Sequence, residues 1–110
     1  MRIALYISCR NLKNYDVKSK TDPQAEIFVR EGHSRDWNFV GRTEVMRDNL
    51  NPDFSEFVEC DYFFEKQQFI LIVINDIDKH NKVDYMGKIE TTLGDLFGSK
   101  RQTFTGDLMN

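Results

Sequence analysis

Short runs rich in isoleucine, valine, phenylalanine and tyrosine, separated by clusters of turn-forming residues, most constrain the fold of this chain. Apolar residues mostly alternate with polar ones, and no window of about 12 residues carries a helical period. The pattern predicts strands over residues 2–9, 26–31, 37–43, 55–60, 67–75, 86–92 and 102–105. Seven short strands at roughly regular spacing predict an all-β fold, an antiparallel β-sandwich with Greek-key connections.

The run over residues 69–74 is apolar on both faces of its predicted strand. Such a strand lies in the middle of a sheet or is covered from outside the chain, and we expect the central position because apolar runs usually mark burial. One short helical turn is expected at residues 93–97, ended by Gly98.

Composition limits the classes of protein. A chain of 110 residues with 40% hydrophobic residues suits one domain with a real core, and 30% charged residues place it away from disorder. The formal charge of −3 argues against nucleic-acid binding, and the longest apolar run is too short to cross a bilayer. Cys9 and Cys60 make no disulfide framework, so we expect a reducing, cytoplasmic location.

Aspartates gather in two of the expected loops. Asp16 and Asp22 bracket the loop after the first strand, and Asp76, Asp78 and Asp84 bracket the loop after residues 67–75. Loops of a sandwich collect at its two ends, so these two loops can face each other, where five carboxylates repel unless a cation compensates them. Calcium is the natural partner, because it takes 6 to 8 oxygen ligands, whereas zinc prefers His and Cys. For one loop alone, solvated turn residues remain the better explanation.

Several motifs in these loops resemble those of C2 domains. They are residues 16–23 (Asp-Val-Lys-Ser-Lys-Thr-Asp-Pro), residues 49–54 (Asn-Leu-Asn-Pro-Asp-Phe), Asp76-Ile-Asp78 and residues 84–87 (Asp-Tyr-Met-Gly). Residues 41–45, 61–65 and 92–94 are most similar to the first C2 domain of a copine. Copines are cytosolic proteins with two C2 domains and a von Willebrand A domain that bind phospholipid in a calcium-dependent way. The resemblance therefore implies the permuted C2 topology, with an eighth strand last, and further domains in the parent protein.

The resemblance also implies a ligand set for two or three calcium ions. The implied side-chain ligands are Asp16, Asp22, Asp76, Asp78 and Asp84, the implied backbone carbonyls are Tyr15, Ile77 and Lys82, and the side chain of Asn81 is a further implied ligand. Residues expected to contact a membrane are Val17, Lys18, Lys20, Lys79 and His80, with Lys82 beside the metals.

These residues predict a module that docks on anionic phospholipid when calcium rises. Two calcium ions would add four positive charges to a domain whose formal charge is −3, and each basic residue near an anionic surface adds up to about 1 kcal/mol. Catalysis is disfavoured, because no Ser–His or Cys–His pairing is evident. A calcium-independent protein-interaction module that uses the acidic loops is the alternative.

The eighth strand of the permuted topology lies between the first and third strands, and no segment after residue 105 reads as that strand. If residue 110 ends the folded unit, residues 102–110 fill that place, a second copy donates a strand, or the first and third strands close up directly. We expect strand exchange and a dimer, because exchange restores the backbone pairing with few new contacts.

Overall fold

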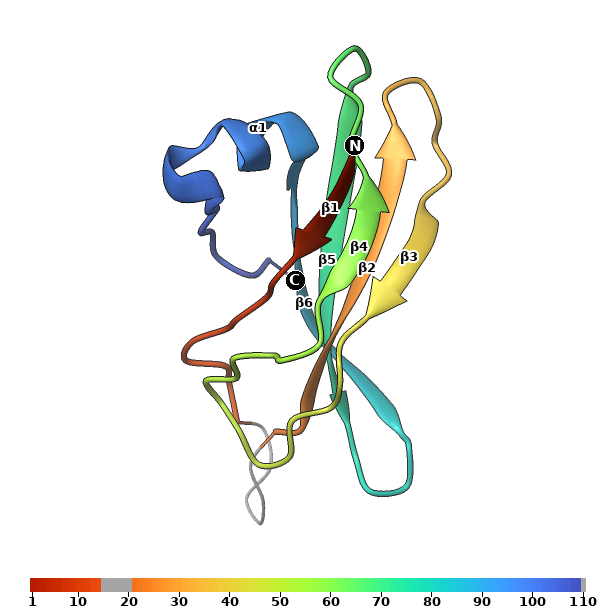
Figure 1. The fold of residues 1–110 in the computed structure, drawn as a ribbon. Coiled ribbons are helices and arrows are strands. Elements are labelled where there is room, and N and C mark those ends of the chain that lie inside the picture. Colours follow the sequence, from red (N-terminus) through yellow and green to blue (C-terminus); the bar gives the residue numbers. More distant parts are fainter. Residues whose placement is uncertain (15–20, 110) are drawn as a thin grey trace.

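Two antiparallel sheets pack face to face in the computed structural model, which describes residues 1–14 and 21–109 (Figure 1). The smaller sheet pairs β1 (Arg2–Leu5) with β4 (Val58–Asp61). The larger sheet has the order β3-β2-β5-β6, formed by β2 (Pro23–Glu31), β3 (Asn38–Arg42), β5 (Gln68–Ile77) and β6 (Val83–Thr92). The predicted all-β antiparallel sandwich is confirmed.

β5 is the central strand, as the run of apolar residues predicts. It pairs antiparallel with β2 along one edge and with β6 along the other. Ile70 and Ile74 on this strand are completely buried in the core. On the outer face the Arg30 guanidinium lies over the Phe69 ring, 4.2 Å from its centroid. A long side chain of this kind covers apolar surface while its charge stays hydrated, so the outer face of β5 is shielded at Phe69.

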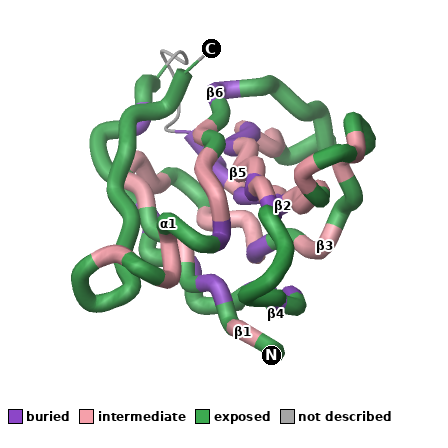
Figure 2. The backbone as a smooth tube through the Cα atoms, turned by 90° about the horizontal axis from the view of Figure 1, so that it is seen from above, coloured by how far each residue is buried: buried purple, intermediate pink, exposed green. Residues whose placement is uncertain are grey.

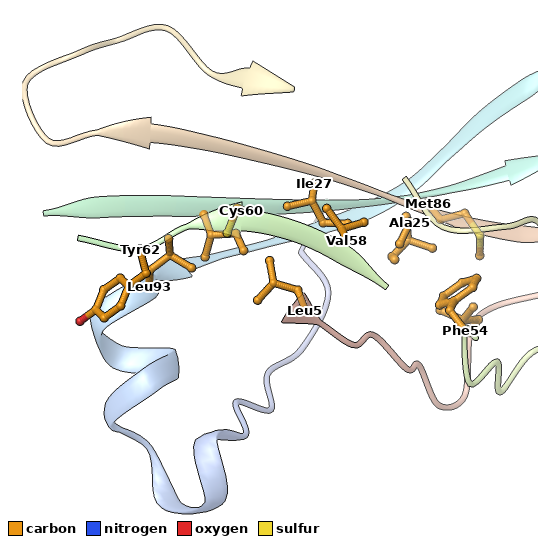
Figure 3. Close-up of a cluster of buried hydrophobic side chains, with 12 residues drawn as sticks. Leu5, Ala25, Ile27, Phe54, Val58, Cys60, Tyr62, Met86 and Leu93 are labelled. Carbon is orange, nitrogen blue, oxygen red and sulfur yellow. The ribbon is translucent and has the colours of Figure 1, made fainter. Parts of the chain in front are cut away.

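The hydrophobic core lies between the two sheets. Leu5, Val58 and Cys60 of the smaller sheet face Ala25 and Ile27 of the larger one (Figure 3). Seen from above, buried residues gather on β5 and the neighbouring strands, whereas the connecting loops are mostly exposed (Figure 2). The two sheets thus bury their inner faces against each other, as aligned sandwich packing requires.

The expected helical turn is present as α1 (Leu93–Gly98). The Thr92 hydroxyl accepts a hydrogen bond from the Asp95 N–H at 3.0 Å, which caps its first turn. Leu93 is fully buried and anchors the helix to the core. A 3₁₀ helix, η1 (Lys100–Gln102), follows. Among residues 1–14 and 21–109, no helix has both the length and the apolar character needed to span a bilayer.

The prediction of a strand over residues 102–105 is wrong. Arg101 and Gln102 adopt left-handed backbone angles, with φ of 59° and 52°, which interrupt an extended chain. Residues 103–109 form one backbone bridge to β6, at Met109, where Lys88 and Met109 exchange two hydrogen bonds of 2.8 Å. Gly87 allows this approach, because a Cβ there would lie 3.2 Å from the Leu108 Cβ. The part of the chain that the structure describes therefore forms six strands.

Further strand boundaries differ from the prediction. β2 begins at Pro23 rather than at residue 26, and β5 ends at Ile77 rather than at residue 75. The first strand ends at Leu5 rather than at residue 9, and beyond it Ser8 makes only an isolated bridge to Asp53. β4 begins at Val58 rather than at residue 55. β6 begins at Val83, so the hairpin that follows β5 is shorter than residues 76–84.

The place expected for an eighth strand is filled by no described residue. β1 pairs with β4 and β3 with β2, so the first and third strands do not close on each other. Residues 103–109 lead to β6 and not to that place. An open hollow of about 400 Å³ lies between β4 on one side and β2 and β3 on the other. Dimer formation by strand exchange stays a prediction, which light scattering of the isolated chain tests.

Candidate functional site

Three segments of the chain meet at one end of the sandwich, the lower end in Figure 1: residues 21–23, 43–50 and 77–83. The first segment lies between the other two. On one side the Met46 N–H donates to the Pro23 carbonyl at 3.0 Å, and on the other the Ile77 N–H donates to the Asp22 carbonyl at 2.9 Å. These backbone bonds hold the three segments in register.

Asp22 makes contacts that join the segments at this end of the sandwich. Its side chain is only 11% exposed, and each carboxylate oxygen has a partner from the segment after β3. Oδ1 accepts the Asp48 N–H at 2.8 Å, and Oδ2 accepts from Nη1 of Arg47 at 3.2 Å. The same Nη1 donates to the Ile77 carbonyl at 2.7 Å. A cation therefore already lies between two of the oxygens that the resemblance implies as calcium ligands.

Asp76 and Asp84 are directly opposite each other across the β5–β6 pair. Oδ1 of Asp76 also accepts the backbone N–H of Asp22 at 2.9 Å, which links this pair to Asp22. Directly opposed residues of an antiparallel pair share one face, with Cβ atoms about 4.5–5.5 Å apart, and like charges in this position are destabilising. This pair of carboxylates thus favours a cation beside it.

Asp78 folds its carboxylate into its own hairpin. Oδ1 accepts the N–H groups of His80 and Lys82, each at 2.8 Å. The bond from the Lys82 N–H is the main cause of the lowered pKa of Asp78; burial opposes it, and the bond from the His80 N–H adds to it. This is the turn role expected of an isolated aspartate. No described residue bonds the second oxygen, Oδ2.

The tip of this hairpin carries the remaining predicted residues of the second loop. Lys79, His80, Asn81 and Lys82 are all exposed. Asn81 has a φ of 63°, a left-handed conformation that asparagine tolerates. The Lys82 carbonyl accepts the Asp78 N–H at 3.0 Å, so one of its lone pairs is in use.

The other predicted residues lie outside the described part of the chain: Tyr15, Asp16, Val17, Lys18 and Lys20. Within residues 1–14 and 21–109, no three His, Cys, Asp or Glu side chains are close enough together to hold a metal ion. The structure thus joins Asp22 to Asp76 by a hydrogen bond and places Asp84 opposite Asp76. Among the described residues, Asp78 bonds only within its own hairpin. The ligand set as a whole stays a prediction.

Arg47 and Asp48 are functional candidates that the sequence analysis missed. Residues 48–52 are rich in turn-forming residues, but nothing local marks Arg47 as a partner of Asp22 and Ile77, which are 25 and 30 residues away along the chain. The sequence feature that could have indicated this role is a basic residue beside that turn-forming segment, in a chain with two acidic loops. Only the paired segments bring these residues together.

The architecture and the carboxylate-rich end define a β-sandwich of the C2 type. The family model described as "C2 domain" matches residues 4–108, and the chain belongs to the C2 domain family. The predicted family is confirmed.

Among curated relatives, Copine-B of Dictyostelium discoideum is 35% identical over 97% of this chain. The alignment covers 22% of Copine-B, so the chain spans about a fifth of the length of that relative. The solved structure BON1-C2B is 26% identical, with a TM-score of 0.70 over 86% of this chain and 66% of that one. A calcium-bound structure of two C2 domains of extended-synaptotagmin 2 is 25% identical, with a TM-score of 0.61 over 86% of this chain and 34% of that one.

Proposed function

We propose that this domain is a calcium-dependent phospholipid-binding module that docks its parent protein on anionic membrane surfaces. The observation that carries the proposal is the linked set of Asp22, Asp76 and Asp84, in which two carboxylates oppose each other and the third already binds a cationic side chain. Hard oxygen donors that attract a cation suit calcium. Membership of the C2 family and the calcium-bound relative support the same assignment.

The proposed ligands for two or three calcium ions extend this set. They are Asp22, Asp76, Asp78 and Asp84, the carbonyls of Ile77 and Lys82 and the side chain of Asn81, together with Asp16 and Tyr15 of the segment outside the described residues. When bound, calcium supplies positive charge and coordination positions that lipid phosphate oxygens can occupy. The chain itself orients its oxygens through the backbone bonds that join the three segments.

Electrostatic attraction would dominate docking. Lys79, His80 and Lys82 are exposed at the tip of the hairpin, where the two lysine charges can approach a lipid headgroup. Val17, Lys18 and Lys20 are proposed to contact the membrane from the neighbouring loop. Recruitment of a multidomain cytoplasmic protein to the membrane surface would then follow calcium, and raised salt would weaken it.

The chemistry of the cysteines supports a binding module and not an enzyme. Burial raises the pKa of the Cys9 thiol to about 11, against a small opposing effect of Arg10. Burial also raises the pKa of Cys60, and the Asp61 charge adds to the shift. Both thiols are therefore protonated at neutral pH and are not activated nucleophiles.

Liposome sedimentation tests the proposal. The domain is mixed with anionic or neutral vesicles, each in calcium and in chelator. We expect it to sediment with anionic vesicles in calcium alone, and to be released as sodium chloride is raised. Equal sedimentation in calcium and in chelator would contradict the proposal that vesicle binding depends on calcium.

One observation favours the alternative, a protein-interaction module that works without calcium. Arg47 already neutralises part of the charge of Asp22, so the acidic end holds together without metal. Such a module would bind its basic partner equally in calcium and in chelator. It would not bind vesicles in either condition.

A further inference from the structure

Arg47 connects three parts of the candidate site with one nitrogen atom. Its Nη1 donates to Oδ2 of Asp22 at 3.2 Å and to the Ile77 carbonyl at 2.7 Å. The side chain is 49% exposed, whereas that of Asp22 is 11% exposed. The charged group thus reaches a buried carboxylate from outside, and it has open solvent beside it.

The two oxygens that Arg47 joins belong to the proposed calcium ligands. Because one nitrogen lies within hydrogen-bond distance of both, the oxygens already point toward a common cation. Calcium binds such oxygens at 2.3–2.6 Å, a shorter distance than either hydrogen bond. A calcium ion and the guanidinium therefore compete for the same acceptors, and their like charges repel.

We propose that Arg47 is an internal counter-ion of the calcium-free site, which calcium displaces when it binds. This inference rests on the proposed function. Without metal, the guanidinium keeps the Asp22 carboxylate paired, because a buried unpaired charge is costly. With metal, the half-exposed side chain swings into solvent. Arg47 thereby raises the calcium concentration at which the site fills.

Asp22 keeps its orientation when Arg47 leaves. Its Oδ1 still accepts the Asp48 N–H, and its backbone N–H and carbonyl still bond Asp76 and Ile77. The exchange therefore replaces one cation with another without rebuilding the loops. The charge of the released guanidinium is then no longer paired with Asp22, at the end of the domain that carries Lys79 and Lys82.

The test is Arg47→Gln, with calcium binding followed by calorimetry and thermal melting followed in calcium and in chelator. We expect the free calcium concentration at half-saturation, the calcium midpoint, to fall about tenfold, the equivalent of about 1.4 kcal/mol of binding free energy. We also expect the melting temperature in chelator to fall. Arg47→Lys keeps the positive charge, and because a single nitrogen makes both contacts in the original protein, it should keep the midpoint within about twofold of the original. Arg47→Met, which keeps an apolar stem, replaces the Gln variant if that variant does not fold.

The matched control is Arg2→Gln at the opposite end of the sandwich. Arg2 is also an exposed arginine paired with two acids, Glu59 and Asp61, and its loss should leave the calcium midpoint unchanged. If the original domain binds calcium and Arg47→Gln binds it equally or more weakly, the inference is overturned and the proposed function stands. If neither binds calcium, both are overturned. If calcium binds only to Arg47→Gln, calcium does not displace Arg47 in the original domain, and both the inference and the proposed calcium dependence are overturned.

Discussion

Glu44 fastens the segment that presents Arg47 and Asp48. Its carboxylate accepts the Ser55 N–H at 2.7 Å, the Ser55 hydroxyl at 2.6 Å and the Glu56 N–H at 3.1 Å. Burial alone would raise the pKa of Glu44, but the bonds from Ser55 and Glu56 outweigh it and lower the pKa from 4.5 to about 2. One side chain thus joins the two ends of a long connection between β3 and β4.

Replacing Glu44 by Gln should destabilise the fold by about 1 kcal/mol, a discounted value because the site is open to solvent. The pKa is depressed in the folded state, so the carboxylate contributes its full stability above pH 4.5 and loses it as the pH falls toward about 2. Urea unfolding between pH 2 and pH 7 measures both effects. Glu56→Gln, with an exposed side chain, is the control and should behave like the original protein at every pH.

Asp84→Asn should weaken calcium binding without unfolding the domain. Asp84 is exposed and opposite Asp76, so its neutralisation relieves like-charge repulsion and should leave the calcium-free fold equally or slightly more stable, by at most about 0.5 kcal/mol. We expect the calcium midpoint from calorimetry to rise about tenfold or more. Asp36→Asn, which removes the same charge from the turn at the other end of the sandwich, should leave the midpoint unchanged. An unaltered midpoint in Asp84→Asn would remove this residue from the ligand set.

At the scale of elements, β5 is the strand on which the rest depends. It pairs along both edges, and its last two residues, Asp76 and Ile77, lie in the candidate site. The apolar run made this position predictable, because a strand that is apolar on both faces is usually buried inside a sheet. The end of β1 and the start of β6 were not predictable in the same way, because they depend on which neighbouring strand supplies hydrogen bonds.

Ile70→Ala on β5 should cost about 3 kcal/mol, since Ile70 is fully buried and the cavity cannot fill with water. Val83→Ala on β6, where the side chain is 57% exposed, should change the free energy of unfolding by less than about 0.5 kcal/mol. Chemical denaturation of both variants measures the difference. Equal losses would contradict the position of Ile70 in the core.

At the scale of the whole molecule, calcium should stabilise the fold, because it binds the assembled loops and not the unfolded chain. At a free calcium concentration of about 100 times the dissociation constant the gain is about 2.7 kcal/mol. For a domain of this size that corresponds to a rise in melting temperature of roughly 10 °C. Scanning calorimetry in calcium, magnesium and chelator measures it, and we expect a small shift with magnesium. Identical melting temperatures in calcium and chelator would argue against a metal site.

The sequence by itself determined the class of fold and the position of the acidic loops. Apolar alternation and turn residues act over a few neighbouring positions, so they predict strands and hairpins directly, as β2, β5 and α1 illustrate. The aspartates could be assigned to loops for the same reason, and the tendency of sandwich loops to collect at two ends made a common site a prediction. The strand predicted over residues 102–105 failed because the conformation there depends on left-handed residues and on the approach of Met109 to β6.

Only the tertiary structure decided how the acidic end is compensated. Asp22, Arg47 and Ile77 are far apart in the chain and come within 3.2 Å through the pairing of three segments. The tertiary structure likewise shows that Oδ1 of Asp78 accepts two N–H groups of its own hairpin. Charge and hydrogen bonding act between atoms in space, so partners of this kind follow from backbone geometry and not from residue spacing along the chain.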